Sequence, residues 1–392
     1  MRTGRIARAV AFCGVALACL ASAAAAPSGA ASGGEPIKIG AIFAVTGPAA
    51  YLGAPEEKTA RMLADQINAG GGLLGKPVKI IVKDSGGSSE KAISFAKQLI
   101  EEEGVVAIVG PTTSGESMAI KELCQKAGMP LISCAAAETI TNPVAKYVFK
   151  TPQKDNYIVE WIYRTMNRLG ISKIGVVASN TGFGNGGKAQ LEKYASKYGI
   201  TIAISEAYDA NATDLSALLT KVNASGAEAI VNWSIEPAQA IVAKNMRQLK
   251  MTQLLFQSHG FGNIKYVEAA GEAAEGIIFP CGRLLVADEL PEGNPQKKLL
   301  QKYASDYKAA YKEEASTFGG HAYDAITVLF AAIKAAQGTE PDKIVVALEG
   351  LKDFAGTGGS FSFSETDHNG LSMDSIAMIT VRKGKFTLYM GK

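Results

Sequence analysis

The chain of 392 residues is too long for one hydrophobic core of ordinary size, so two lobes of usual domain length are the first expectation. Its 40 basic and 37 acidic residues nearly cancel, and 47% of its residues are hydrophobic, which is ample for burial. The near-neutral charge excludes proteins that depend on a basic face, such as nucleic-acid binders and proteins that adhere to anionic membranes.

The N-terminus has the pattern of a secretory signal peptide over residues 1–26. Three Arg residues precede an apolar stretch over 9–20, and small residues then offer cleavage sites. Cleavage would leave 37 residues of each charge, and residues 27–35 would form a flexible lead-in. We therefore predict a periplasmic protein, with a lipid-anchored form through Cys19 as the minor alternative, because Ala16 stands where a Leu is usual.

From residue 37 onward, predicted strands and helices alternate with short gaps. The strands are expected at 37–44, 78–83, 105–109, 130–133, 173–178, 202–207, 229–233 and 254–257. The helices are expected at 56–68, 89–103, 114–127, 155–169, 188–198, 214–223 and 237–249. The C-terminal part differs, with helices at 294–311, 321–337 and 342–348, hairpin material at 354–364, and strands at 375–381 and 385–389. The alternation predicts the α/β class, with parallel sheets covered on both faces by helices.

A short sequence pattern that occurs twice supports two similar lobes. Lys38-Ile39-Gly40 ahead of Thr46-Gly47 recurs as Lys173-Ile174-Gly175 ahead of Thr181-Gly182, with the same spacing. Each copy is a strand, a turn and a helix. A chance match stays open, because Lys-Ile-Gly before a buried strand is common.

The stretch 105–117 reads as a buried strand that runs directly into a helix. Gly110-Pro111 ends the strand, and Thr113 or Ser114 can cap the helix that follows. The first NH groups of a helix are unpaired and carry a partial positive charge, so a small carboxylate can be held there without Lys or Arg. Ser114 is therefore either a helix cap or part of an anion site.

Two motifs resemble enzyme signatures but fit them poorly. Gly182-Phe183-Gly184-Asn185-Gly186-Gly187 matches a dinucleotide-binding pattern, but Ser179 to Thr181 lengthen the turn, and an exported protein lacks access to nicotinamide pools. We interpret it as a Gly-rich cleft loop. Gly115-Glu116-Ser117-Met118-Ala119 resembles a nucleophile elbow, but it has Ala in place of the second Gly. We expect no cofactor and no catalytic step.

Cysteine and histidine usage predicts neither a disulfide framework nor a metal site. Cleavage of the signal would leave Cys124, Cys134 and Cys281, so at most one bridge can form. The three histidines are His259, His321 and His368, and they share no ligand spacing. We interpret His321 as a surface or capping residue. His259 follows a predicted strand, where α/β sheets place ligand contacts.

Taken together, these residues resemble the type I periplasmic solute-binding proteins of ABC importers, specifically the Leu/Ile/Val-binding group. The markers are Lys38-Ile39-Gly40, Thr46-Gly47-Pro48, Gly53, Ile67-Asn68-Ala69-Gly70-Gly71, Val109-Gly110-Pro111 with Ser114, Phe183-Gly184 and Gly271-Glu272-Ala273-Ala274-Glu275-Gly276. The resemblance implies two Rossmann-like lobes with parallel sheets, joined by three crossings near Pro152, Gly282 and Ser375. Lobe 1 would comprise 36–153 and 283–375, and lobe 2 would comprise 154–282 and 376–392.

The resemblance also implies a ligand site in the cleft between the lobes. Ser114, with Thr113 beside it, would bind a ligand carboxylate, assisted by the main chain of Ala135 and Ala137. Phe183 matches the aromatic cleft residue of the second lobe.

Three positions depart from the family pattern, and they would contact the part of the ligand other than its carboxylate. Ala137 replaces a threonine, His259 replaces the glutamate that receives a ligand ammonium, and Ile235 beside Trp233 replaces a tyrosine. A buried ammonium needs an anionic partner, which His259 does not supply. The hypothesis is therefore a carboxylate with an apolar or aromatic body. Leucine-like amino acids are the runner-up, because Glu236 or Asp84 could reach the cleft.

The function expected from this resemblance is capture of the ligand and its delivery to a membrane permease, by a monomer that binds no nucleic acid. A ligand sensor for a signalling partner is the alternative, and a dinucleotide-dependent or hydrolytic enzyme is a more distant one.

Overall fold

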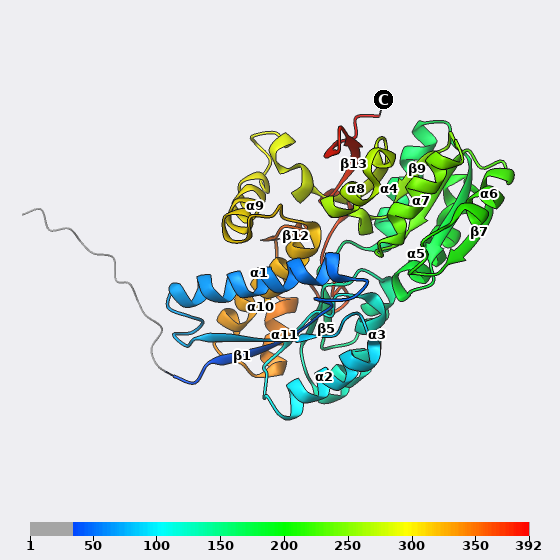
Figure 1. Ribbon diagram of the computed structural model, residues 1–392. Helices are drawn as coiled ribbons and strands as arrows, with labels where there is room; N and C mark the ends of the chain where they lie inside the picture. Colours follow the sequence, from blue (N-terminus) through cyan, green and yellow to red (C-terminus); the bar gives the residue numbers. More distant parts are fainter. Residues whose placement is uncertain (1–33, 392) are drawn as a thin grey trace, which may run out of the picture.

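The computed structural model describes residues 34–391, and within this range the strands form two main sheets with helices packed against them (Figure 1). The predicted α/β class and the parallel sheets are confirmed. The signal-peptide interpretation of residues 1–26 lies outside the described residues, as does the lead-in up to residue 33. No helix of the described part is both long and apolar enough to span a membrane.

The first sheet is parallel, with the order β2-β1-β3-β4-β5. Its strands are β1 (Ile37–Phe43), β2 (Val78–Asp84), β3 (Ile108–Val109), β4 (Leu131–Ser133) and β5 (Val148–Lys150). Its helices are α1 (Ala50–Ala69), α2 (Ser89–Glu101), α3 (Ser114–Ala127), α10 (Thr317–Ala336) and α11 (Pro341–Glu349), with α9 (Lys297–Tyr311) beside α1. Apolar side chains of α1, α10 and α11 pack against one face of this sheet and those of α2 and α3 against the other, so both faces are covered.

The second sheet has the order β14-β13-β10-β9-β8-β6-β7 and is parallel except at β13 and β14. Its strands are β6 (Lys173–Ser179), β7 (Thr201–Tyr208), β8 (Ala229–Trp233), β9 (Leu254–Gln257), β10 (Ile278–Gly282), β13 (Ile376–Arg382) and β14 (Lys385–Leu388). Its helices are α4 (Asp155–Arg168), α5 (Gly182–Ala195), α6 (Ser216–Ala224), α7 (Ala238–Gln248) and α8 (Ile264–Ala270). A third, two-stranded sheet pairs β11 (Phe354–Ala355) with β12 (Ser360–Phe361).

Three connections join the two halves. The chain leaves β5 for α4, leaves β10 for the 3-10 segment Arg283–Glu289, and returns to β13 after a short turn, Met373–Ser375. In Figure 1 the elements from β1 to β5, with α10 and α11, form one body, and α4 to α7 with their strands form the other. The division into two lobes that move against each other remains our proposal.

Helix α1 begins six residues earlier than predicted, and a contact between the halves accounts for this. The prediction placed its start at Glu56, but the helix contains Pro55, which lacks an NH group and usually ends or kinks a helix. The carbonyl of Tyr51, which a residue at position 55 would normally bond, instead accepts a hydrogen bond of 2.7 Å from the side-chain amide of Asn263. Asn263 also caps α8 through its other side-chain atom. A partner distant in the sequence therefore allows the proline.

Two other boundaries differ from prediction. Helix α5 begins at Gly182 rather than at residue 188, because Thr181 caps it by accepting a hydrogen bond from the Gly184 NH. Strand β3 is shorter than the apolar run from Val105, although the Val106 NH still bonds the carbonyl of Lys38. Thus the glycine motif is the first turn of a helix and not a loop.

The two halves are in direct contact with each other. A Cβ on Gly182 would lie 2.9 Å from the backbone N of Gly115, which places the first turns of α5 and α3 in close contact. Thr317 bonds the carbonyl of Gly262 through both its NH and its hydroxyl, at 3.2 and 3.0 Å. The residues between these contacts are sealed from solvent.

Candidate ligand-binding site

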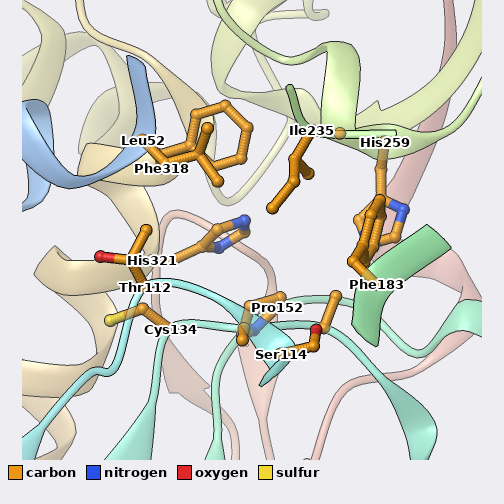
Figure 2. Close-up of a pocket in the computed structure, with 13 residues that line it drawn as sticks. Leu52, Thr112, Ser114, Cys134, Pro152, Phe183, Ile235, His259, Phe318 and His321 are labelled. Carbon is orange, nitrogen blue, oxygen red and sulfur yellow. The ribbon is translucent and has the colours of Figure 1, made fainter. Parts of the chain in front are cut away.

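A small pocket lies between the two halves (Figure 2). Most of its lining is apolar, and its polar side chains are few, which is the composition of a small-molecule site. The lining residues are Leu52, Thr112, Ser114, Cys134, Ala135, Ala136, Pro152, Phe183, Ile235, His259, Gly260, Phe318 and His321. They come from segments that follow strands of both sheets and from α1, α3, α5 and α10, so a ligand here would contact both halves.

Helix α3 presents Ser114 to this pocket. Thr113 is the N-cap, because its hydroxyl accepts from the Glu116 NH and the Glu116 carboxylate accepts from the Thr113 NH. This capping box makes Ser114 the first helical residue, and its side chain is only 2% exposed. The cap and the candidate anion site are therefore different residues. Thr113 caps the helix and does not line the pocket, whereas Ser114 lines the pocket.

The main-chain donors implied by the resemblance already have partners inside the protein. The Ala137 NH donates to the Ser114 hydroxyl oxygen at 3.2 Å, and the Ala135 NH donates to the Ser133 hydroxyl oxygen at 3.0 Å. Ala135 lines the pocket and Ala137 does not. Ser114 keeps its own hydroxyl hydrogen for a ligand, because its oxygen is the acceptor in that bond.

The second half contributes an aromatic wall. Phe183 and Ile235 line the pocket, and Trp233 lies behind them, 5.8 Å from the Phe183 ring centroid. The indole NH of Trp233 is buried and has no hydrogen-bond partner among residues 34–391. A Cβ on Gly187 would lie 2.1 Å from the indole ring, so a glycine of α5 makes room for it. Packing therefore accounts for this glycine without a nucleotide.

His259 completes this wall and is held in its neutral form. Its ring lies 5.4 Å from Phe183 and 5.9 Å from Trp233, and it is 4% exposed. Burial lowers the pKa of His259 well below its ordinary value, and the charges of its surroundings, including Lys150, lower that pKa further. Neither ring nitrogen has a hydrogen-bond partner in the described part of the chain.

Asp155 stands next to His259, at the start of α4. Its Oδ1 lies 3.8 Å from Nε2 of His259, which is too long for a hydrogen bond. Burial raises the pKa of Asp155 to about 7, although the positive charge of Lys150 acts in the opposite direction. Both carboxylate oxygens are buried without a hydrogen-bond partner of normal geometry within the described residues. Asp155 was not among the candidates from the sequence, where it reads only as an acidic first-turn residue.

The acids that the sequence offered as alternatives are engaged elsewhere. Glu236 bonds the Ser234 hydroxyl and the Ile235 NH, and Asp84 bonds Thr46. Neither lines the pocket. Asp155 does not line the pocket either, but it lies next to His259, which does, and its carboxylate has no hydrogen-bond partner within the described residues.

The interpretation of His321 as a surface or capping residue is wrong. Its side chain is 5% exposed and lines the pocket, because α10 begins at Thr317 and points its first turns at the cleft. Phe318 lies in the same turn, with its ring 6.2 Å from that of His321. The predicted helix began at residue 321 and so concealed this geometry. Leu52 was missed in the same way, because it lies in the unpredicted first turns of α1.

Neither metal binding nor disulfide formation is supported by the described residues. No group of three or more His, Cys, Asp or Glu side chains there could hold a metal ion. Cys124, Cys134 and Cys281 are buried free thiols, so no bridge forms between them.

Comparison with known proteins agrees with this architecture. The model of the periplasmic binding protein family matches residues 36–385. The leucine-, isoleucine-, valine-, threonine- and alanine-binding protein of Pseudomonas aeruginosa is 26% identical over 340 residues, covering 84% of this chain and 86% of its own length.

Solved structures give the same result. An extracellular ligand-binding receptor from Rhodopseudomonas palustris HaA2 is 26% identical, with a TM-score of 0.86 over 91% of this chain and 100% of its own. The branched-chain amino acid binding protein LivJ of Streptococcus pneumoniae, in complex with isoleucine, is 29% identical, with a TM-score of 0.80 over 90% and 98% of the two chains. The chain therefore belongs to the periplasmic binding protein family, in the type I group whose relatives are named for Leu, Ile and Val binding.

Proposed function

We propose that this chain is the extracytoplasmic substrate-binding component of an ABC importer, and that it captures a small carboxylate with an apolar or aromatic body. The observation that carries the proposal is Ser114, the first residue of α3, buried in a pocket between two halves. A carboxylate there would accept from the Ser114 hydroxyl and meet the positive end of the helix. Leu52, Phe183 and Ile235 would surround the body of the ligand.

A buried positive charge, that of Lys150, lies next to the pocket. The ammonium of Lys150 is buried and donates to the carbonyl of Ala136, whose residue lines the pocket. Burial lowers the pKa of Lys150, and the carboxylates of Asp155 and Glu138 raise it, so this charge is partly balanced inside the protein and favours an anionic ligand only in part. The bound ligand would stabilise the closed state, because only that state offers contacts from both halves at once.

A thermal-shift and calorimetric screen of the purified protein tests the proposal. The panel contains benzoate-like acids, phenylpropanoid acids, branched-chain keto acids and the amino acids leucine, isoleucine and valine. We expect stabilisation by acids that lack an amino group. Stabilisation by leucine or valine alone would contradict the argument from His259. Loss of uptake of the same ligand on deletion of the gene would separate transport from sensing.

A hydrophobic amino acid is the second candidate, and Asp155 is the observation that favours it. Its buried carboxylate, 3.8 Å from His259, would gain a partner from a ligand ammonium. The substitution Asp155→Asn removes the charge but keeps the shape. Under the amino-acid alternative it should weaken leucine binding by about tenfold or more, whereas under our main proposal it should leave binding of a keto acid nearly unchanged.

A further inference from the structure

His321 is a polar group in the pocket that the carboxylate proposal does not use. It extends from α10, and Figure 2 shows its ring pointing toward the centre of the pocket. Its Nδ1 atom is buried and has no hydrogen-bond partner among the described residues. A buried polar atom without a partner destabilises the folded state, so such an atom in a ligand pocket calls for an explanation.

The surroundings of His321 determine which groups it can receive. Burial and the charge of Lys150 lower its pKa to about 3, so the ring is neutral at ordinary pH. A neutral imidazole has one nitrogen that donates and one that accepts. His259, across the pocket, is neutral for the same reasons. The two histidines therefore offer hydrogen bonds but no charge.

The neighbours of His321 in the pocket are mostly apolar. Phe318 and Leu52 lie beside it (Figure 2), and the hydroxyl of Thr112 is directed away, because it donates to the carboxylate of Glu56. A charged ligand group would have no counter-charge on this side chain and would lose its hydration. A ketone oxygen could only accept. A hydroxyl both donates and accepts, so it matches either tautomer of the ring.

We propose that His321 is a specificity-determining residue that receives a neutral hydroxyl on a ligand whose carboxylate is bound at Ser114. This inference rests on the proposed function and narrows it: the substrate class is a hydroxylated carboxylic acid with an apolar or aromatic body. Ser114 would form a hydrogen bond with the carboxylate, and His321 would form one with the hydroxyl. The apolar side chains between them would set the length of the ligand.

The test compares pairs of acids that differ only in one hydroxyl. Calorimetric titrations use benzoate against 3- and 4-hydroxybenzoate, and 3-phenylpropanoate against 3-(4-hydroxyphenyl)propanoate. We expect the wild-type protein to bind at least one hydroxylated member about tenfold more tightly than its parent acid. His321→Leu should reduce that preference to less than about twofold, with affinity for the parent acid nearly unchanged. His321→Gln, which can still donate and accept, should keep part of the preference.

Ser114→Ala is the matched control, because it should weaken both members of a pair equally. Thermal melts of each variant confirm folding, and the wild-type preference decides the question even if His321→Leu does not fold. Equal or weaker binding of every hydroxylated acid by the wild type would overturn the inference and leave the carboxylate proposal standing. An undiminished preference in folded His321→Leu would also overturn it. Failure of every acid to bind would reject the proposed function and this inference together.

Discussion

The two walls of the pocket differ in how their polar atoms are satisfied. On the α3 side, Ser114, Ala135 and Ala137 all take part in internal hydrogen bonds. On the opposite side, both ring nitrogens of His259 and the indole NH of Trp233 have no partner within the described residues. The main-chain donors of Ala135 and Ala137 are thus bonded within the protein, whereas the second wall holds buried donors and acceptors without a partner. Under our proposal the Ser114 wall binds the carboxylate, whereas the unpartnered polar groups of His259, Trp233 and His321 are free to discriminate among ligands.

The largest expected effect concerns the packing of the second wall. Gly187→Ala would place a Cβ 2.1 Å from the fully buried Trp233 ring, and neither α5 nor the ring has room to move. We expect a loss of about 3 kcal/mol in the free energy of unfolding, measured by urea denaturation.

Gly186→Ala is the matched control one residue earlier in α5. Its Cβ would meet Ala137 at 3.7 Å and Asp155 at 3.9 Å, which are ordinary contacts. Because alanine favours a helix over glycine, this variant should be neutral or slightly more stable. Equal stability of the two variants would show that the indole does not fix the second wall.

The first wall is tested by Ser114→Ala. The change removes one hydroxyl from a desolvated carboxylate, and we expect a loss of about 1.5–3 kcal/mol in the binding free energy of the acid, by calorimetry. Stability of the free protein should change little, because Thr113 supplies the cap. Unchanged affinity would reduce Ser114 to a structural role.

The contact between the halves is tested by Asn263→Asp. Aspartate still accepts from the Lys265 NH and so keeps the cap of α8, but it cannot donate to the Tyr51 carbonyl. We expect ligand affinity to fall by about 1–2 kcal/mol through loss of the closed state, while the melting temperature of the free protein changes little. An unchanged affinity would show that this contact does not favour closure.

The smallest effect is the pH dependence of His321. Its folded pKa of about 3 is below the ordinary value near 6.5, so the unfolded chain binds the extra proton and stability falls as pH falls below that value. The raised pKa of Asp155 acts in the opposite direction, since the folded state holds its proton up to about pH 7. The difference in the free energy of unfolding between His321→Leu and the wild type therefore reports the pH dependence that is due to His321.

The free energy of unfolding of His321→Leu, relative to that of the wild type, should rise by about 1 kcal/mol as the pH falls from 6.5 to 5.5. Urea denaturation without ligand measures it. A difference that does not depend on pH would mean that His321 is not buried as a neutral ring.

The sequence predicted the alternating elements and the position of Ser114 well, because both follow from local patterns. A buried strand followed by Gly110-Pro111 and a capping threonine specifies its own geometry. The start of α1 could not be predicted, since the Tyr51 carbonyl that Pro55 leaves without a helical partner is bonded by Asn263, a residue distant in the sequence. His321 and Asp155 were missed for a related reason. Each lies in the first turns of a helix, and only the packing of the chain places His321 in the pocket and Asp155 next to His259.

The most direct test of a carboxylate site at Ser114 is a calorimetric comparison of the best-binding acid with its carboxamide, which has the same shape but no charge. If the carboxylate meets the N-terminus of α3 and the charge of Lys150, the amide should bind at least about tenfold more weakly. Equal binding of acid and amide would contradict the account.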